Sequence, residues 1–353
     1  MSDSKNLDAK KHGVLYIGMD LGTSRTSVSA SNGVRETVFS VVGYPKDVVS
    51  QKLLKKDVLY GKEALDKRLS LRMYKPLEKG VLKYTGEAKD PEAKANLKAA
   101  QDLIGEAIRL ARPRADELVY CVIGAPAEAS VRNREAIVEA AKAHVDAVML
   151  CSEPFSVAYG MDMLEDVLVV DIGAGTTDLC RMHGTMPEEA DQVMFDVAGD
   201  AVDAELARRI EQSCAGAQFT TQMVKELKER WGFVGDAPEK CLVDLPVDGK
   251  PTQFDLTDQI RAACSILIDP ICKGITKLIA TFDPEFQARL KNRVLLAGGG
   301  SMVRGLDSAI EKAMKERLGG GKVVRIEEPI YGGANGALKI AHDMPAEYWE
   351  QRK

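Results

Sequence analysis

The sequence has few aromatic residues and no long apolar run. Phe, Trp and Tyr make up 5% of its 353 residues, and no apolar stretch approaches the roughly 18 residues of a membrane-spanning helix. The seven cysteines are odd in number and include no C-x-x-C pair, and the four histidines lie far apart. These spacings argue against a disulfide framework and a zinc site. We therefore expect reduced, mostly buried thiols.

The first residues lack the features of a targeting or anchoring segment. One leucine stands among the charges of residues 1–12, without the apolar region of a signal peptide or the apolar face of a membrane anchor. We expect a disordered tail over 1–12 and a cytoplasmic protein with no direct membrane insertion.

The charge of the chain is acidic overall but unevenly distributed. The formal net charge of −5 argues against nucleic acid as the main partner. Residues 44–114 carry 17 Lys and Arg against 10 Asp and Glu, and this excess of +7 leaves −12 for the rest. Such a bias usually marks a solvated face.

Strands and helices alternate along the chain, which predicts an α/β fold built as two similar halves. The lysine-rich stretch between 44 and 118 resembles an inserted subdomain containing one long helix. The strands are expected at 14–19, 26–30, 118–126, 147–150, 166–172, 176–182, 293–297 and 322–326. The helices are expected at 92–110, 129–143, 201–212, 220–231, 257–281 and 303–317, with two more beginning near 153 and after 331.

One phrase occurs twice, as "YIGMDLGTSRTS" at 16–27 and as "VVDIGAGTTDLC" at 169–180. Each copy is an apolar strand that ends in aspartate and is followed by a turn of small and hydroxyl residues. Such a turn offers converging N–H groups and hydroxyls to phosphate oxygens, and the aspartate can face a Mg²⁺ ion. Two ordinary hairpins are the simpler explanation of either copy, but two copies in the same context favour a phosphate grip from both sides.

The candidate residues of the two hairpins share these roles. Asp20 and Asp171 are the metal-facing carboxylates, bound to Mg²⁺ through water. The phosphate-facing residues are Gly22, Thr23, Ser24 and Arg25 in the first copy and Gly173, Ala174, Gly175, Thr176 and Thr177 in the second. Neither copy is a P-loop, because no G-K-[ST] sequence opens a helix.

Two further segments fit a nucleotide site. "AGGGSMVRGL" at 297–306 predicts a strand, a glycine turn and a helix start, which suits adenine or phosphate. Glu153, in "CSEPFSVAYG", follows a strand and could orient or deprotonate a water; alternatively it complements the dipole of the helix it begins. The candidate residues of the glycine turn are Gly298, Gly299, Gly300 and Ser301.

The helix "MVKELKERWGFVG" places Met223, Leu227 and Trp231 on one face. Lys225, Lys228 and Glu229 project elsewhere, and from the residues alone a solvated polar face explains them.

In this order, the two hairpins, "SEPFSVAYG", "LLAGGGSMVRGL" and "YGGANGALKIA" resemble the actin, heat-shock chaperone and sugar kinase superfamily over about residues 13–342. The resemblance implies two lobes with ATP and Mg²⁺ between them, and places Lys225, Lys228 and Glu229 near the nucleoside. Glu153 stands where bacterial actins such as MreB carry their catalytic glutamate. The implied boundaries are 13–165 for lobe I, 166–325 for lobe II with an insertion at about 201–270, and 326–353 for a segment returning to lobe I.

"FSVVGYPKDVV", "KPLEKGVL" and "MPAEYWEQ" are similar to the MamK family of filament-forming bacterial actins, which align magnetosomes. This resemblance implies an ATPase that polymerises head to tail, with partners on the magnetosome. In such a filament, the basic segment 44–114 would face the next subunit. A small-molecule kinase and a nucleotide-switched binding module that never polymerises remain as alternatives.

Overall fold

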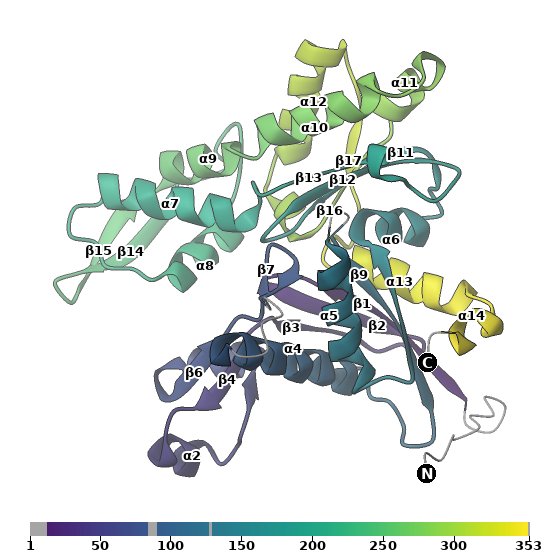
Figure 1. Cartoon of the computed structure of the whole chain (residues 1–353). Coiled ribbons are helices and arrows are strands. Elements are labelled where there is room, and N and C mark those ends of the chain that lie inside the picture. Colours follow the sequence, from purple (N-terminus) through teal and green to yellow (C-terminus); the bar gives the residue numbers. More distant parts are fainter. Residues whose placement is uncertain (1–12, 84–89, 127–128, 352–353) are drawn as a thin grey trace. The chain divides into compact units, whose positions relative to one another are not determined.

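The computed structural model describes residues 13–83, 90–126 and 129–351. The chain divides into two compact units (Figure 1). Unit 1 comprises Met1–Asp162 and Tyr331–Lys353, and unit 2 comprises Met163–Ile330. The disordered tail predicted for residues 1–12 lies outside the described residues.

Unit 1 is built on a five-stranded sheet with the strand order β10-β9-β1-β2-β3. β1, β2 and β3 form an antiparallel meander, whereas β9 and β10 run parallel to β1. Every residue of β9 is buried, as expected for a strand in the middle of a sheet covered on both faces. The bounds are β1 Val14–Leu21, β2 Arg25–Ala30, β3 Arg35–Phe39, β9 Leu118–Ala125 and β10 Ala147–Ser152.

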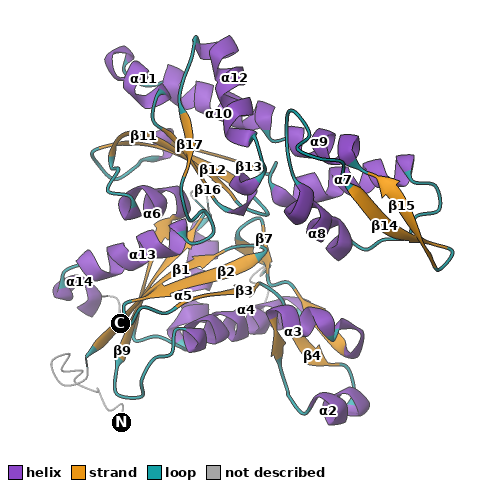
Figure 2. Ribbon diagram, turned by 180° about the vertical axis from the view of Figure 1, so that it is seen from behind, coloured by secondary structure: helices purple, strands orange, loops and turns teal. Residues whose placement is uncertain are grey.

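The two faces of this sheet are covered by different helices. Leu15, Ile17 and Met19 alternate along β1 and join one core with the apolar residues of α4 (Pro91–Leu110) and α5 (Val131–Lys142). Figure 2 shows α4 running alongside β2 and β3. Gly18 faces the other side, where a Cβ atom would lie 2.1 Å from the carbonyl oxygen of Ala334. Only glycine therefore allows α13 to pack this closely on β1.

α13 (Gly332–Asp343) also packs against α6 (Glu153–Gly160), and α14 (Ala346–Glu350) is the last described helix. The part between β3 and α4 is a small sheet with the order β5-β4-β6 and a two-stranded hairpin, β7–β8. Its elements are β4 Val42–Pro45, α2 Val48–Leu54, β5 Leu59–Tyr60, α3 Gly61–Asp66, η1 Arg68–Ser70, β6 Leu71–Tyr74, β7 Leu77–Glu78 and β8 Val81–Leu82.

Unit 2 repeats the topology of unit 1. Its sheet has the order β13-β12-β11-β16-β17, with an antiparallel meander followed by two parallel strands. The predicted α/β fold with two similar halves is therefore confirmed. The bounds are β11 Glu165–Ile172, β12 Thr177–His183, β13 Gln192–Phe195, β16 Val294–Ala297 and β17 Val323–Arg325.

The apolar core of unit 2 is formed by this sheet, its helices and a separate hairpin, β14–β15. The helices are η2 Glu189–Asp191, α7 Gly199–Ser213, α8 Thr221–Trp231, α9 Thr257–Ser265, α10 Ile268–Ala280, α11 Pro284–Lys291, η3 Gly299–Met302 and α12 Leu306–Leu318. The hairpin strands are β14 Leu242–Val247 and β15 Lys250–Asp255.

Two helix predictions were wrong in detail. The single helix expected at 257–281 is two helices, because Pro270 has no N–H to donate to the carbonyl of Ile266 and its ring clashes with that group. The helix expected from 303 begins at Leu306, because Gly305 has a φ of +77° and cannot continue a right-handed helix.

All seven cysteines are free thiols and six of them are buried, as predicted. No helix among the described residues is long and apolar enough to cross a membrane.

Candidate functional site

In unit 1, the carboxyl ends of three parallel strands bring two candidate carboxylates together. Asp20 of β1 lies opposite Gly124 of β9, and Gly124 lies opposite Cys151 of β10. Glu153 follows β10 and begins α6. A Cβ atom on Gly124 would lie 3.4 Å from Cγ of Glu153, so the glycine leaves room for this side chain. Ligands of open α/β sheets bind at this end of the strands.

The surroundings of Asp20 fit a bound cation. Gly333, in the first turn of α13, is so close that a Cβ atom there would lie 3.1 Å from Oδ2 of Asp20. Burial raises the pKa of Asp20 to about 6. A positive charge next to a desolvated carboxyl favours its ionised form, so the chemistry of this residue suits Mg²⁺ or its bound water.

Side chains hold the first turn in place. The hydroxyl of Thr23 accepts a hydrogen bond of 2.8 Å from the N–H of Gly80 in the β7–β8 turn. Ser40 donates its hydroxyl to the carbonyl of Gly22 at 2.6 Å and its N–H to the carbonyl of Ser24 at 3.0 Å. Thr23 is thus a structural support of the turn as well as a candidate phosphate ligand.

Arg25 begins β2, and its guanidinium lies over the ring of Phe39, 4.8 Å from the ring centre. This stacking fixes the charge beside the first turn.

In unit 2, the second turn is held by backbone groups instead. The carbonyls of Gly173 and Ala174 accept hydrogen bonds of 3.1 and 2.7 Å from the N–H groups of Gly199 and Asp200 at the start of α7. The N–H of a trans peptide points opposite to its carbonyl. The N–H groups of Ala174 and Gly175 therefore point away from α7, as two neighbouring donors of the kind that bind phosphate.

Other groups of the second hairpin are used within the protein. The N–H of Gly173 donates to the carbonyl of Thr176 at 2.9 Å and closes the turn. Thr177 is fully buried, and its hydroxyl donates to the carbonyl of Val197 at 2.9 Å. The N–H of Gly173 and the hydroxyl of Thr177 therefore stabilise the conformation of the turn itself.

The glycine run after β16 packs directly against Asp171. Gly298 has a φ of +74°, and a Cβ atom there would lie 2.3 Å from Oδ1 of Asp171. Ser301 is buried and donates its hydroxyl to the carbonyl of Gly298 at 2.7 Å, so it closes the η3 turn. A Cβ atom on Gly300 would meet Ile172, whereas Gly299 faces open space. Gly299 thus leaves a bare backbone exposed, one residue after the glycine that contacts Asp171.

The structure places Lys228 beside the second hairpin, away from a solvated face. Its Nζ atom lies 2.8 Å from the carboxylate of Asp203 and 2.8 Å from the carbonyl of Gly199. Lys225 is half-buried and Glu229 is exposed on the same helix, α8. Sequence reasoning missed Asp203, because nothing local to α7 indicates a partner on α8.

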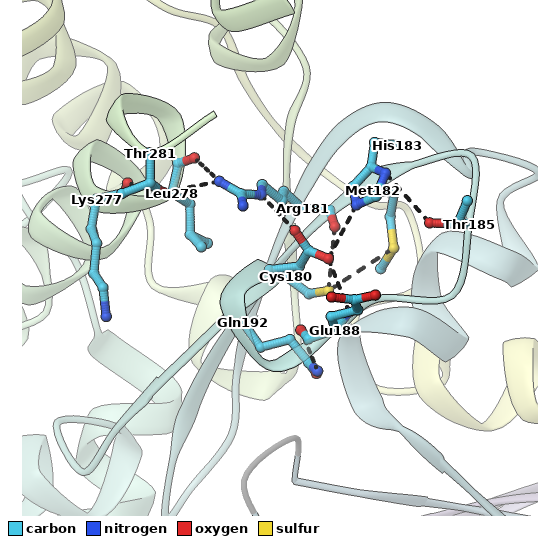
Figure 3. Close-up of polar contacts among 11 residues, drawn as sticks. Cys180, Arg181, Met182, His183, Thr185, Glu188, Gln192, Lys277, Leu278 and Thr281 are labelled. Atoms are coloured by element: carbon cyan, nitrogen blue, oxygen red, sulfur yellow. Dashed lines mark hydrogen bonds and ion pairs between the residues drawn. The ribbon is translucent and has the colours of Figure 1, made fainter. Parts of the chain in front are cut away.

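A second polar cluster in unit 2 lies outside the predicted site (Figure 3). Arg181 donates to the carboxylate of Asp191 at 2.7 Å, to the carbonyl of Leu278 at 2.7 Å and to the hydroxyl of Thr281 at 2.9 Å. The other oxygen of Asp191 lies 3.1 Å from Nε2 of His183. The charges of Arg181 and Asp191 compensate each other, so we interpret this cluster as structural.

Comparison with known proteins identifies the family. The model of the MreB/Mbl protein family matches residues 15–347. The actin-like protein MamK of Paramagnetospirillum magneticum is 36% identical over 96% of this chain and 95% of its own length. The chain belongs to the MamK branch of the MreB/Mbl family. The predicted class of filament-forming actin-like proteins is thereby confirmed at the level of the family.

Solved structures of MamK agree with this assignment. The chain of a MamK double helical filament is 36% identical and superposes with a TM-score of 0.89, covering 94% of this chain and all of that one. A non-polymerising MamK mutant bound to AMPPNP is 35% identical with a TM-score of 0.71, over the same shares of both chains. The family therefore supports nucleotide binding and self-association in general terms.

Proposed function

We propose that this protein is an ATPase that forms head-to-tail filaments and uses hydrolysis to control their turnover. The observation that carries the proposal is the repeated strand, aspartate and turn, present at equivalent positions of two sheets with the same topology. The second turn supplies backbone donors, and each preceding strand supplies a carboxylate. Together they provide the groups that a magnesium-bound triphosphate requires.

The candidate residues have separate roles in binding the metal and the nucleotide. Asp20 and Asp171 would hold the water shell of Mg²⁺, which neutralises phosphate charge when bound. Within the described residues no group of three or more His, Cys, Asp or Glu forms a metal cage; binding through water by separate carboxylates is the usual mode for Mg²⁺. The remaining nucleotide-binding residues are those of the two turns, Lys225, Lys228 and Glu229 of α8, and Gly298–Ser301.

Glu153 is the proposed catalytic residue. Its side chain lies beside Gly124 of β9, the strand next to that of Asp20, where a carboxylate can orient a water and accept its proton during attack on the γ-phosphate.

In the cell we propose a cytoplasmic filament that positions magnetosomes through linker proteins. The support is the similarity to MamK, whose solved filament superposes on this chain.

Three measurements on the purified full-length chain test the proposal. Titration with Mg-ATP should give one nucleotide per chain; two independent sites would contradict this. Phosphate should be released without an added acceptor, whereas a small-molecule kinase would require one. Pelleting and electron microscopy with Mg-ATP should show filaments, and a binding module would stay in the supernatant.

A further inference from the structure

The strongest unassigned feature near the proposed nucleotide site is the ion pair between α7 and α8. Asp203 and Lys228 lie 2.8 Å apart, and their side chains are only 16% and 13% exposed. Lysine is rarely buried unless it is paired. The side chain of Lys228 must cross from α8 to the start of α7, where it also donates to the carbonyl of Gly199.

The same point of α7 holds the second phosphate turn. Gly199 donates its N–H to the carbonyl of Gly173 while its own carbonyl accepts from Lys228. A Cβ atom on Gly199 would lie 3.2 Å from the Cα of Ala174 and 3.3 Å from Nζ of Lys228. The ammonium group therefore lies next to the turn, within the space that this glycine leaves open.

Burial and the ion pair with Lys228 act on the pKa of Asp203 in opposite directions. Burial raises the pKa of Asp203, although the neighbouring Lys228 opposes that shift. An ammonium group has three donors. The carbonyl of Gly199 accepts one of them, whereas Oδ1 of Asp203 lies at ion-pair distance without hydrogen-bond geometry. The pair carries no net charge, so the remaining donors of Lys228 act by their position and not as an isolated charge.

We propose that Asp203 is a positioning residue for nucleotide binding, which holds Lys228 by ion pairing so that a remaining N–H of its ammonium group is presented to the nucleotide beside the second turn. This inference rests on the proposed nucleotide site. Without the carboxylate, Lys228 regains the rotational freedom of a long side chain, which binding must then remove. The alternative is that the pair only joins α7 to α8, in which case it affects stability alone.

A double-mutant cycle on the full-length protein separates the two roles. The dissociation constant of Mg-ATP is measured for the wild type, Asp203→Asn, Lys228→Gln and the double variant, with thermal unfolding as a check on folding. We expect each single change to weaken binding about tenfold. The double variant should bind as Lys228→Gln does, because Asp203 acts only through Lys228.

Two further variants complete the design. Asp203→Glu keeps the charge and should recover part of the affinity, and it replaces Asp203→Asn if that variant does not fold. Glu211→Gln removes an exposed carboxylate from the other end of α7 and should bind Mg-ATP normally.

Unchanged or tighter binding by Asp203→Asn would overturn the proposal, and so would losses that multiply in the double variant. Failure of the wild type to bind Mg-ATP would instead reject the proposed function itself.

Discussion

The two sheets share one topology, yet their turns are supported differently. In unit 1, hydroxyl groups of Thr23 and Ser40 brace the turn. In unit 2, backbone N–H groups at the start of α7 do so. A side-chain support can be lost by a single substitution, whereas a backbone support persists as long as the helix does. The repeated phrase therefore specifies the turn in both units, and the surrounding fold determines what holds it.

A second repeat shows where the two units diverge in chemistry. β10 and β17 occupy equivalent places, and each is followed by glutamate and proline, Glu153–Pro154 and Glu328–Pro329. Glu153 lies beside Gly124. Gly124 belongs to β9, the strand next to the strand β1 that carries Asp20. Glu328 is exposed, and the carbonyl of Pro329 accepts a hydrogen bond of 3.1 Å from Gly298. The equivalent places in the two sheets thus hold two glutamates, and we infer a catalytic position for only one.

The largest effect is expected from these matched glutamates. Glu153→Gln should lower the rate of ATP hydrolysis by about 10²–10⁴-fold, because general base catalysis contributes about that much. Mg-ATP binding and assembly should persist and filaments should live longer. Glu328→Gln is the control and should hydrolyse ATP at the normal rate. Phosphate release and pelleting measure both; comparable hydrolysis by the two variants would remove Glu153 from the catalytic role.

The next largest effect concerns the stability of unit 2. Arg181→Met leaves Asp191 buried without its cation and should destabilise the protein by about 3–5 kcal/mol. Although burial opposes it, hydrogen bonds from the N–H of Glu188, from Arg181 and from His183 hold the pKa of Asp191 below its ordinary value of 3.8.

The lowered pKa of Asp191 makes the stability of the protein depend on pH. A lowered folded-state pKa stabilises the protein above about pH 4, and the contribution decreases as the pH falls toward the folded-state value. Chemical denaturation between pH 7 and pH 3 should show a weaker pH dependence for Arg181→Met than for the wild type. An equal dependence in both would mean that another carboxyl group dominates acid unfolding.

Much of the fold was predictable because its signals are local. The apolar strands ending in Asp20 and Asp171 are hairpins in the structure, as their patterns indicated. Pro270, which divides the helix expected at 257–281, was also a readable signal, since proline interrupts the hydrogen bonds of a helix interior. The small sheet β5-β4-β6 was not predicted, because its strands are two to four residues long and too short to show alternation.

The candidate site was predictable only in part, since some of its contacts join distant segments. Gly333 approaches Asp20 from the far end of the sequence, and Asp203 meets Lys228 across two helices. Neither position has a spacing that indicates its partner. Ser301 carried a signal that suggested a ligand, yet its hydroxyl closes a turn.

Removal of either metal-facing carboxylate should weaken Mg-ATP binding, with an effect smaller than those of the Glu153 and Arg181 substitutions. Asp20→Asn and Asp171→Asn should each weaken Mg-ATP binding by about tenfold or more, because a charge-assisted contact contributes about 1.5–3 kcal/mol. Asp258→Asn removes an exposed carboxylate of unit 2 and serves as the control. Calorimetric titration with and without Mg²⁺ measures the loss. If only one of the two aspartates mattered, the proposal that both residues hold the water shell of Mg²⁺ would be wrong.

The smallest effect is expected from the charge difference between the units. Unit 2 carries 20 Lys and Arg against 28 Asp and Glu, a net charge of −8, which leaves +3 for unit 1. In unit 1, α2 exposes Val48, Val49 and Leu53 by 70% or more and carries Lys52 next to them. An apolar patch with a basic rim is suited to an acidic surface of another copy of the chain.

We therefore expect the double reversal Lys52→Glu with Lys55→Glu to slow assembly several-fold and to weaken its dependence on salt. Exposed charges mainly steer encounter, and salt screens them within about 8 Å at physiological ionic strength. Lys56 is left unchanged because it forms an ion pair with Glu63 at 2.7 Å.

Reversal of Arg132 and Lys142, which are exposed on α5, changes the net charge by the same amount at another place and is the control. Light scattering across a salt titration at fixed Mg-ATP compares the pairs. Equal slowing by both would trace the effect to net charge, and α2 would then be an ordinary solvated helix.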